Sequence, residues 1–148
     1  MYRFRISVDI DAPPAHVWRA LCDPNEVVRW DAGVVEARDA PADYPRPGQT
    51  VRWRCRGGPF RVLVDRPREV VRERVLRSFL SVGPYRLDET YVLAHRDGGS
   101  ALVAEVEVGV ALPLIGGILA DRYAGPRFES DFAASLAALK RHCEASAS

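Results

Sequence analysis

The sequence has few cysteines and no long apolar run, and each shortage excludes a class of protein. Its three cysteines, Cys22, Cys55 and Cys143, lie far apart and include no C-x-x-C pair. This pattern is typical of neither a disulfide framework nor a zinc site. The longest stretch without a charged residue, 108–120, contains Pro113 and is shorter than the ~18–20 residues that a membrane span needs. We therefore expect free cysteines, no metal site and no insertion into a membrane.

An excess of charge of one sign is also missing. The chain has 148 residues, of which 21 are basic and 20 acidic, so its net charge is +1 and exerts little attraction on nucleic acid. The sequence does not open with a charged segment followed by an apolar one, so we expect no secretion signal and a cytoplasmic protein. With 47% hydrophobic and 28% charged residues, it fits one folded domain over 1–148.

The first thirty residues contain clear start signals for three elements. Alternation of apolar and polar residues predicts a strand over 2–10. Pro14 suits the first turn of a helix, and the helical spacing of the apolar residues after it predicts a short helix. Asp23 followed by Pro24 predicts the N-terminus of a second short helix, which ends near Trp30.

Strand patterns separated by turn residues fill 32–111, and they predict about six further strands. The glycine pairs at 57–58 and 98–99 predict hairpins. On the strand that follows the first pair, Val62 and Val64 define the apolar face and Asp65 belongs to the polar one. We expect this strand to turn at Pro67, with a further strand beginning near Val70.

The period of the pattern changes in the last third of the chain. From Leu114 to about Cys143, apolar residues recur every three or four positions, which predicts a long helix with one apolar stripe. Pro126 predicts a kink or a short break near Gly125.

This order of elements predicts an α+β fold, which the family resemblance described below identifies as a helix-grip fold. Its parts are a strongly curved antiparallel sheet of about seven strands, two short helices after the first strand, and the C-terminal helix over the concave face. A curved sheet cannot contact a single helix along its whole width, so we expect an enclosed apolar cavity between them.

Glycines at the start of the long helix have two interpretations. Gly116, Gly117 and Gly125 interrupt an apolar segment, and a glycine in a helix interior costs ~1 kcal/mol relative to alanine. Either the small residues leave space for a cavity and a flexible portal, or they let the backbone pack closely against the sheet.

Two segments resemble a known superfamily. Residues 6–30, I-S-V-D-I-D-A-P-P-A-H-V-W-R-A-L-C-D-P-N-E-V-V-R-W, are similar to the N-terminal signature of START-like (SRPBCC) proteins, in which A-P-x-x-x-V-W precedes D-P and a tryptophan. Residues 112–117 and 135–140 are similar to the last strand and helix of that superfamily. Its polyketide cyclase/dehydrase-like members match best, and the fold is shared with birch-pollen-allergen-like proteins. The resemblance implies an internal pocket for small apolar molecules and no single chemistry.

Glu89 is the most informative polar residue, because it interrupts the apolar face of the strand that carries Tyr85, Leu87 and Tyr91. A carboxyl group in an apolar interior has a raised pKa and suits general acid or base catalysis. The alternatives are a bulge that turns Glu89 outward, or an arginine that pairs with it. Together with Glu89, Tyr85 and Tyr91 are the catalytic candidates, since their hydroxyl groups could orient a carbonyl or hydroxyl group of a substrate.

The candidates for binding a ligand lie on the predicted inner faces of the sheet and the C-terminal helix. They are Trp53, Tyr85, Leu87, Glu89, Tyr91, Val106, Val108, Leu114, Ile118, Phe128 and Phe132.

Basic residues concentrate on the middle strands. Arg52, Arg54, Arg56, Arg61, Arg72 and Arg74 are typical of a solvated sheet face, and neither interleaved exposed aromatic residues nor a groove-reading helix accompanies them. One of Arg72, Arg74 and Arg77 could instead point inward and bind a ligand carboxylate.

The sequence contains no H-E-x-x-H zinc motif, no G-x-S-x-G motif and no glycine-rich phosphate loop, so we expect no cofactor. The pattern favours binding of a small hydrophobic, lipid- or polyketide-like molecule between sheet and helix. The alternatives are a polyketide cyclase or dehydratase that uses the same cavity, and an interaction module that uses the basic sheet face. No nucleic-acid partner is expected, and the oligomeric state stays open, a homodimer included.

Overall fold

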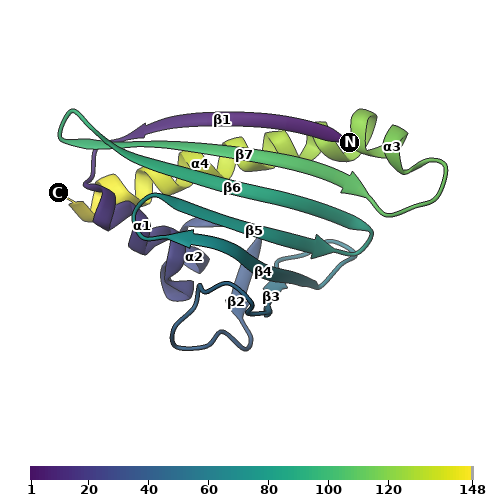
Figure 1. The fold of residues 1–148 in the computed structure, drawn as a ribbon, viewed down its shortest axis with the longest axis horizontal. Coiled ribbons are helices and arrows are strands. Elements are labelled where there is room, and N and C mark those ends of the chain that lie inside the picture. The colour runs from purple at the N-terminus through teal and green to yellow at the C-terminus, as the bar shows by residue number, and fades with distance from the viewer. Residues whose placement is uncertain (148) are drawn as a thin grey trace.

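The computed structural model describes residues 1–147, so Ser148, the last residue of the predicted domain, lies outside the described part (Figure 1). In chain order the elements are β1 (Tyr2–Ile10), α1 (Pro14–Cys22), α2 (Pro24–Trp30), β2 (Val34–Ala37), β3 (Val51–Cys55), β4 (Val62–Val71), β5 (Val75–Val82), β6 (Tyr85–Arg96), β7 (Gly99–Val110), α3 (Gly116–Leu119), the π-helical turn η1 (Ala120–Ala124) and α4 (Gly125–Ala147).

All seven strands belong to one antiparallel sheet in the order β1-β7-β6-β5-β4-β3-β2. The sheet is not closed, because β1 and β2 are its two edges. Figure 1 shows α4 running along one face of the sheet, behind the strands, with α1 and α2 at one end. The predicted α+β helix-grip fold is therefore confirmed.

Local sequence signals place the first elements where they were expected. The side chain of Asp23 accepts a hydrogen bond of 2.9 Å from the backbone N–H of Asn25, and this cap begins α2 at Pro24. In β1, Phe4 and Ile10 are buried on the inner face, while Arg3 and Arg5, on either side of Phe4, are exposed.

The prediction of a turn at Pro67 was wrong. The strand continues through Pro67 to Val71, with a register shift between Pro67 and Glu69, and the chain reverses at 72–74, where Glu73 has a φ of 61°. A proline lacks the N–H that a sheet ladder requires, but an irregularity of this kind accommodates it within a strand.

The assignment of faces on β4 was also wrong. Because Val51 pairs with Asp65 and Trp53 pairs with Leu63, the inner face of β4 carries Leu63 and Asp65. Only 4% of Asp65 is exposed. The apolar residues at 62 and 64 lie on the outer face instead, so a strand with apolar residues on both faces misled the alternation argument.

The break predicted near Gly125 is present as η1, which ends at Ala124. A Cβ on Gly125 would lie 2.1 Å from the Tyr2 ring, and one on Gly116 would lie 2.3 Å from the carbonyl oxygen of Val110. Close packing therefore accounts for these two glycines. Gly117 differs, because a Cβ there would have no neighbour within 4 Å.

The core consists of two apolar clusters that meet α4 at different places. The first contains Val17, Trp53, Leu102 and Leu139 and joins α1, α2 and the C-terminal half of α4 to the sheet. The second is built around Phe4, Leu87, Val106, Val108 and Ala124, and the N-terminal half of α4 packs on it through Phe128 and Phe132.

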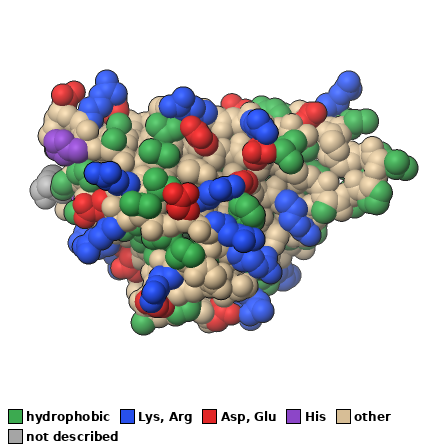
Figure 2. All heavy atoms as spheres, viewed as in Figure 1, with side chains coloured by type: hydrophobic (Ala, Val, Ile, Leu, Met, Phe, Trp, Pro, Cys, Tyr) green, Lys and Arg blue, Asp and Glu red, His purple; other side chains and the backbone are tan. Residues whose placement is uncertain are grey.

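The face of the sheet turned away from α4 is charged. Figure 2 shows basic and acidic side chains interleaved across it. Arg77 and Asp88 form a bidentate ion pair, in which the guanidinium group donates hydrogen bonds of 3.0 and 2.7 Å to the carboxylate. Arg54 lies 3.0 Å from Glu36, and Arg3 lies 3.4 Å from Glu107. Each of these three acids on the outer face therefore has an arginine beside it.

Two further observations concern the described residues as a whole. Cys22 and Cys143 are buried free cysteines, and Cys55 is a half-buried one. Within 1–147, no helix combines the length and the apolar character that crossing a bilayer would require.

Candidate ligand-binding site

Part of the concave face, where side chains pack against the two core clusters, keeps some access to solvent. Six side chains that point from the sheet or from α4 into the interior are only half-buried: Leu63, Leu80, Tyr85, Glu89, Phe128 and Phe132. A tightly filled core would bury all of them. The enclosed cavity expected from the sequence stays a prediction, but this half-buried lining marks where a ligand could contact the protein.

Aromatic rings form one end of this lining. Tyr85 lies edge-on to Phe60 and to Phe128, with ring centroids 5.9 and 5.5 Å apart, and Phe4 lies edge-on to Phe132 at 5.5 Å. Such arrangements are favourable for aromatic rings. This end therefore presents rigid apolar surfaces suited to an apolar ligand.

Polar groups gather at the other end, around Asp65. Its Oδ2 accepts a 2.6 Å hydrogen bond from the hydroxyl of Tyr44, in the loop before β3, and a 3.1 Å hydrogen bond from Nε1 of Trp53. Burial raises the pKa of Asp65, and the donor groups around it, on Tyr44, Trp53 and Ser78, oppose that rise. The Oδ1 atom is buried and has no hydrogen bond of ordinary geometry.

Glu89 lies beside this group. Its register is unbroken, with Ser78 on one side and Val106 on the other, both buried on the inner face. The side chain of Glu89 therefore points inward, without the bulge or the arginine that the sequence left open. Burial raises the pKa of Glu89 to about 8, the charges of Asp65 and Asp31 raise it further, and a hydrogen bond with Tyr91 acts in the opposite direction.

Asp31 is the third acid of this polar end. It follows α2 and accepts a 2.8 Å hydrogen bond from the backbone N–H of Gly33, while burial raises its pKa. The pKa of Tyr91 lies well above its ordinary value, first because of burial and then because of the charge of Glu89. The pKa of Tyr44 is also raised, first by burial, then by the charge of Asp65 and the hydrogen bond with it, and then by the charge of Glu89.

The groups that shift the pKa values of these three acids are other acids and hydrogen-bond donors, and no arginine, lysine or histidine is among them. The residues of 1–147 also contain no cluster of three or more histidine, cysteine, aspartate or glutamate side chains arranged to bind a metal ion. The arrangement can therefore hold a proton on Glu89 at neutral pH and present several oxygens to one polar group.

Most of the predicted ligand-binding residues face the interior. Trp53, Leu87, Tyr91, Val106 and Val108 are buried there, and Tyr85, Glu89, Phe128 and Phe132 line it while half-buried. The exceptions are Leu114 and Ile118, which are 101% and 57% exposed and do not face the interior. The cause is that residues 112–115 form a turn outside the sheet before α3 begins at Gly116.

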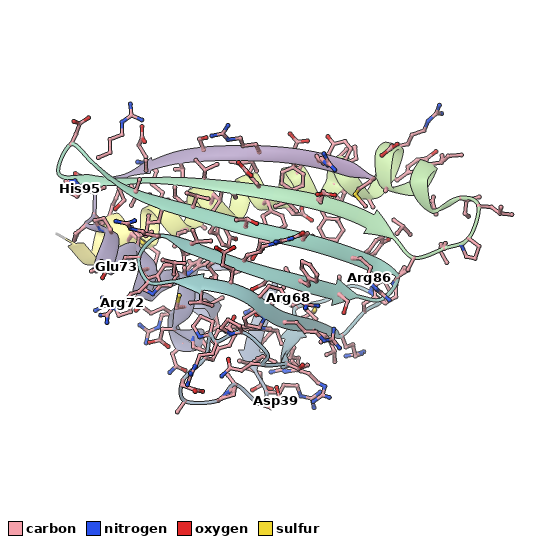
Figure 3. All side chains as sticks on the ribbon, in the orientation of Figure 1. Asp39, Arg68, Arg72, Glu73, Arg86 and His95 are labelled. Atoms are coloured by element: carbon pink, nitrogen blue, oxygen red, sulfur yellow. The ribbon has the colours of Figure 1, made fainter. Side chains whose placement is uncertain are left out.

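The arginines considered as inward-pointing ligands all lie elsewhere. Arg77 pairs with Asp88 on the outer face, and Arg74 is exposed. Figure 3 shows Arg72 with Glu73 at the turn between β4 and β5, and its side chain is 87% exposed. None of them can bind a ligand carboxylate in the interior.

Sequence reasoning missed Asp31, Tyr44 and Asp65. A signal for Asp65 was available, because Arg66 and Arg68 follow it one and three residues later and both favour the outer face, which leaves Asp65 facing inward. No comparable signal exists for Tyr44 or Asp31, since both lie in loops that tertiary packing brings to the site.

Comparisons with known proteins agree with this architecture. The family model described as "Polyketide cyclase / dehydrase and lipid transport" matches residues 1–144. No curated protein is similar to the chain in sequence.

Three examples represent the solved structures that are similar to this chain. Protein CV1439 from Chromobacterium violaceum has a TM-score of 0.74 and 21% identity, with 96% of each chain covered. DynU16, from the dynemicin biosynthetic locus, has a TM-score of 0.72 and 19% identity over 97% of this chain and 48% of its own. The Aha1 dimer from Colwellia psychrerythraea has a TM-score of 0.72 and 13% identity over 97% of both chains. At sequence identities of 13%, 19% and 21%, the similarity shows a shared fold only.

Proposed function

Because the chain belongs to the polyketide cyclase/dehydrase and lipid transport family, within the START-like (SRPBCC) superfamily, we propose that it binds a small, largely apolar molecule between the concave face of the sheet and α4. One observation supports this proposal above the others: the lining side chains pack against the two apolar clusters and yet remain only half-buried. Apolar surface removed from water would drive binding, at ~25 cal/mol per Å².

The proposed binding mode has an apolar body on the aromatic end and a polar group toward Glu89. Tyr85 and Phe128 present ring edges and faces to the body of the ligand. Glu89 and Tyr91 orient its polar end. Entry requires movement near 113–125, where the exposed turn, the short α3 and η1 interrupt regular packing.

A neutral fluorescent probe tests this proposal. We expect Nile red to bind the wild-type protein and gain fluorescence. Leu80→Trp, which fills the concave face, should weaken binding by about tenfold or more. Ser81→Trp is the matched control, because Ser81 is the next residue of β5 and points to the outer face.

Two outcomes would overturn the proposed site. One is the absence of Nile red binding to wild-type protein whose thermal unfolding is cooperative. The other is equal binding by the two tryptophan variants. Native mass spectrometry of the purified protein provides an independent check, since a retained organic molecule would add a discrete mass.

A second candidate function is catalysis of the cyclase or dehydratase type, favoured by the position of Glu89 beside Tyr91. A carboxyl group whose pKa is about 8 can donate a proton or accept one near neutral pH. With an aromatic polyketide precursor as substrate, this function predicts turnover that Glu89→Gln or Tyr91→Phe abolishes while binding persists. Turnover that survives in both variants would exclude these residues as catalytic groups.

The homodimer considered from the sequence stays a prediction. The solution structure of Aha1 from Colwellia psychrerythraea is that of a dimer, which supports testing the same state here. Sedimentation at several concentrations would measure it.

A further inference from the structure

The interior contains three carboxyl groups, and within the described part of the chain no basic side chain acts on them. On the outer face, by contrast, Asp88 and Glu36 each have an arginine within 3.0 Å. Buried carboxylates are normally paired with a base or a metal ion, because moving a charge out of water without a partner is costly. Among the residues of 1–147, no cationic group acts on these three acids, and burial keeps Glu89 protonated at neutral pH unless a cation is supplied.

One buried oxygen of Asp65 has no hydrogen-bond donor beside it in ordinary geometry. Its side chain is almost fully buried, and both of its hydrogen bonds from Tyr44 and Trp53 end on Oδ2. Oδ1 has no hydrogen-bond partner, although the hydroxyl of Ser78 lies near enough to lower the pKa of the carboxyl group. An unsatisfied buried oxygen of this kind is rare in folded proteins and requires an explanation.

The register places Glu89 close to the carboxyl group of Asp65. Ser78 is the cross-strand partner of Glu89 on β5, and it is also the partner of Pro67, two residues from Asp65 on β4. Glu89 and Asp65 thus lie on either side of Ser78 on the same inner face. The other titratable groups that act on Glu89 are Asp31 and Tyr91, and Tyr44 interacts with it from the loop before β3.

We propose that the ligand carries a protonated amine, which binds between Glu89 and the free oxygen of Asp65 while the apolar body of the ligand lies on the aromatic end. This inference rests on the proposed function and specifies the class of ligand. An ammonium group has three donors and a positive charge, so it can satisfy Asp65 Oδ1 and pair with ionised Glu89 at once. A ligand carboxylate would be repelled, and a carbonyl group has no donor.

Matched probes that differ only in the polar group test the inference. They are 4-phenylbutylamine, 4-phenylbutan-1-ol and 4-phenylbutyrate, measured by isothermal titration calorimetry against the folded, full-length chain. At pH 8 we expect the amine to bind about tenfold or more tightly than the alcohol, and the carboxylate to bind most weakly.

The dependence on pH gives a second readout. In the free protein Glu89 is protonated below about pH 8, and it must lose that proton to pair with the ammonium group. The affinity for the amine should therefore rise by about tenfold or more from pH 6 to pH 8. Near pH 6.5, titrations in buffers of different ionisation enthalpy should show that a proton is released on binding of the amine and none on binding of the alcohol.

Glu89→Gln should remove both the preference for the amine and its pH dependence, and leave binding of the alcohol nearly unchanged. Glu105→Gln is the matched control, since Glu105 lies on the outer face of β7, near Arg5. It should retain the preference.

The outcomes separate the two proposals. If the alcohol or the carboxylate binds as tightly as the amine, or if Glu89→Gln retains the preference, the amine inference is overturned and the apolar site remains. If none of the three probes binds but Nile red does, the amine inference fails alone. If Nile red also fails to bind, the proposed function fails with it.

Discussion

Asp88 and Glu89 are consecutive residues of β6, yet their environments are opposite. Asp88 points to the outer face, where Arg77 binds both of its carboxylate oxygens. Glu89 points inward, where burial and neighbouring acids raise its pKa to about 8. A strand turns successive side chains to opposite faces, so one step along the chain moves a carboxyl group from a neutralised surface into an apolar interior.

The two faces of the sheet differ in the same way as these two residues. Outside, several acids are paired with arginines at the surface, where water solvates both partners. Inside, Asp31, Asp65 and Glu89 gather beside tyrosines without a base. Polarity on the outer face needs no further explanation, whereas polarity on the inner face indicates a function.

The largest effect expected from this comparison concerns Glu89 and pH. A carboxyl group whose folded pKa is about 8, against an ordinary value of 4.5, binds more protons in the folded state between these two pH values. Folding stability is therefore lost as the pH rises from 4.5 to 8, by about 4–5 kcal/mol at most. Glu89→Gln should be nearly as stable as wild type at pH 4.5 and more stable by up to that amount at pH 9, measured by urea unfolding.

A stability difference between wild type and Glu89→Gln that is the same at both pH values would contradict the interior position of this acid. A ¹³C NMR titration of the Glu89 carboxyl group would measure its pKa directly and separate it from other groups.

Two glycines of the C-terminal segment show a similar contrast, because one is closely packed and the other is not. Gly125 faces the interior, and a Cβ there would lie 2.1 Å from the Tyr2 ring, so Gly125→Ala should cost about 1–3 kcal/mol. Gly117 faces open space, so Gly117→Ala should be neutral or stabilise α3 by up to about 1 kcal/mol. Thermal unfolding of both variants measures this difference, and equal effects would argue against the close packing of Gly125.

The smallest effect is expected on the outer face. Asp88→Asn removes the ion pair with Arg77, whose two side chains are 41% and 29% exposed. Pairs of this kind contribute little because water already solvates both partners, so the loss should be about 0.5–1 kcal/mol. Chemical unfolding in low and high salt provides the measurement. A loss of several kcal/mol would show that the outer face contributes more than a solvated surface does.

The sequence predicted the order of the elements because each one carries a local signal. Alternation defined β1, the Asp23-Pro24 pair defined the start of α2, and the change of period defined the terminal helix. Glu89 was found for the same reason, since it stands at a position where the pattern of β6 requires an apolar residue. The strand pattern failed on β4, where apolar residues occupy both faces and Pro67 suggested a turn.

The composition of the polar end could not be predicted in the same way. Tyr44 and Trp53 meet at Asp65 because a loop, β3 and β4 pack together, and no spacing along the chain encodes that meeting. Leu114 and Ile118 were placed inside because they are apolar, but the chain leaves the sheet before it reaches them. Their apolar character alone did not indicate which side of the fold they would cover.

By itself, the sequence determined the type and order of the elements, the superfamily and the inward face of β6, because hydrophobic periodicity and capping act between residues close together in the chain. Tertiary structure alone decided that Asp31, Asp65 and Glu89 share one interior region. It also decided that acids of the outer face, such as Asp88 and Glu36, are paired with arginines. The reason is that electrostatic environment depends on distance in space, and strands far apart along the chain become neighbours only when the sheet forms.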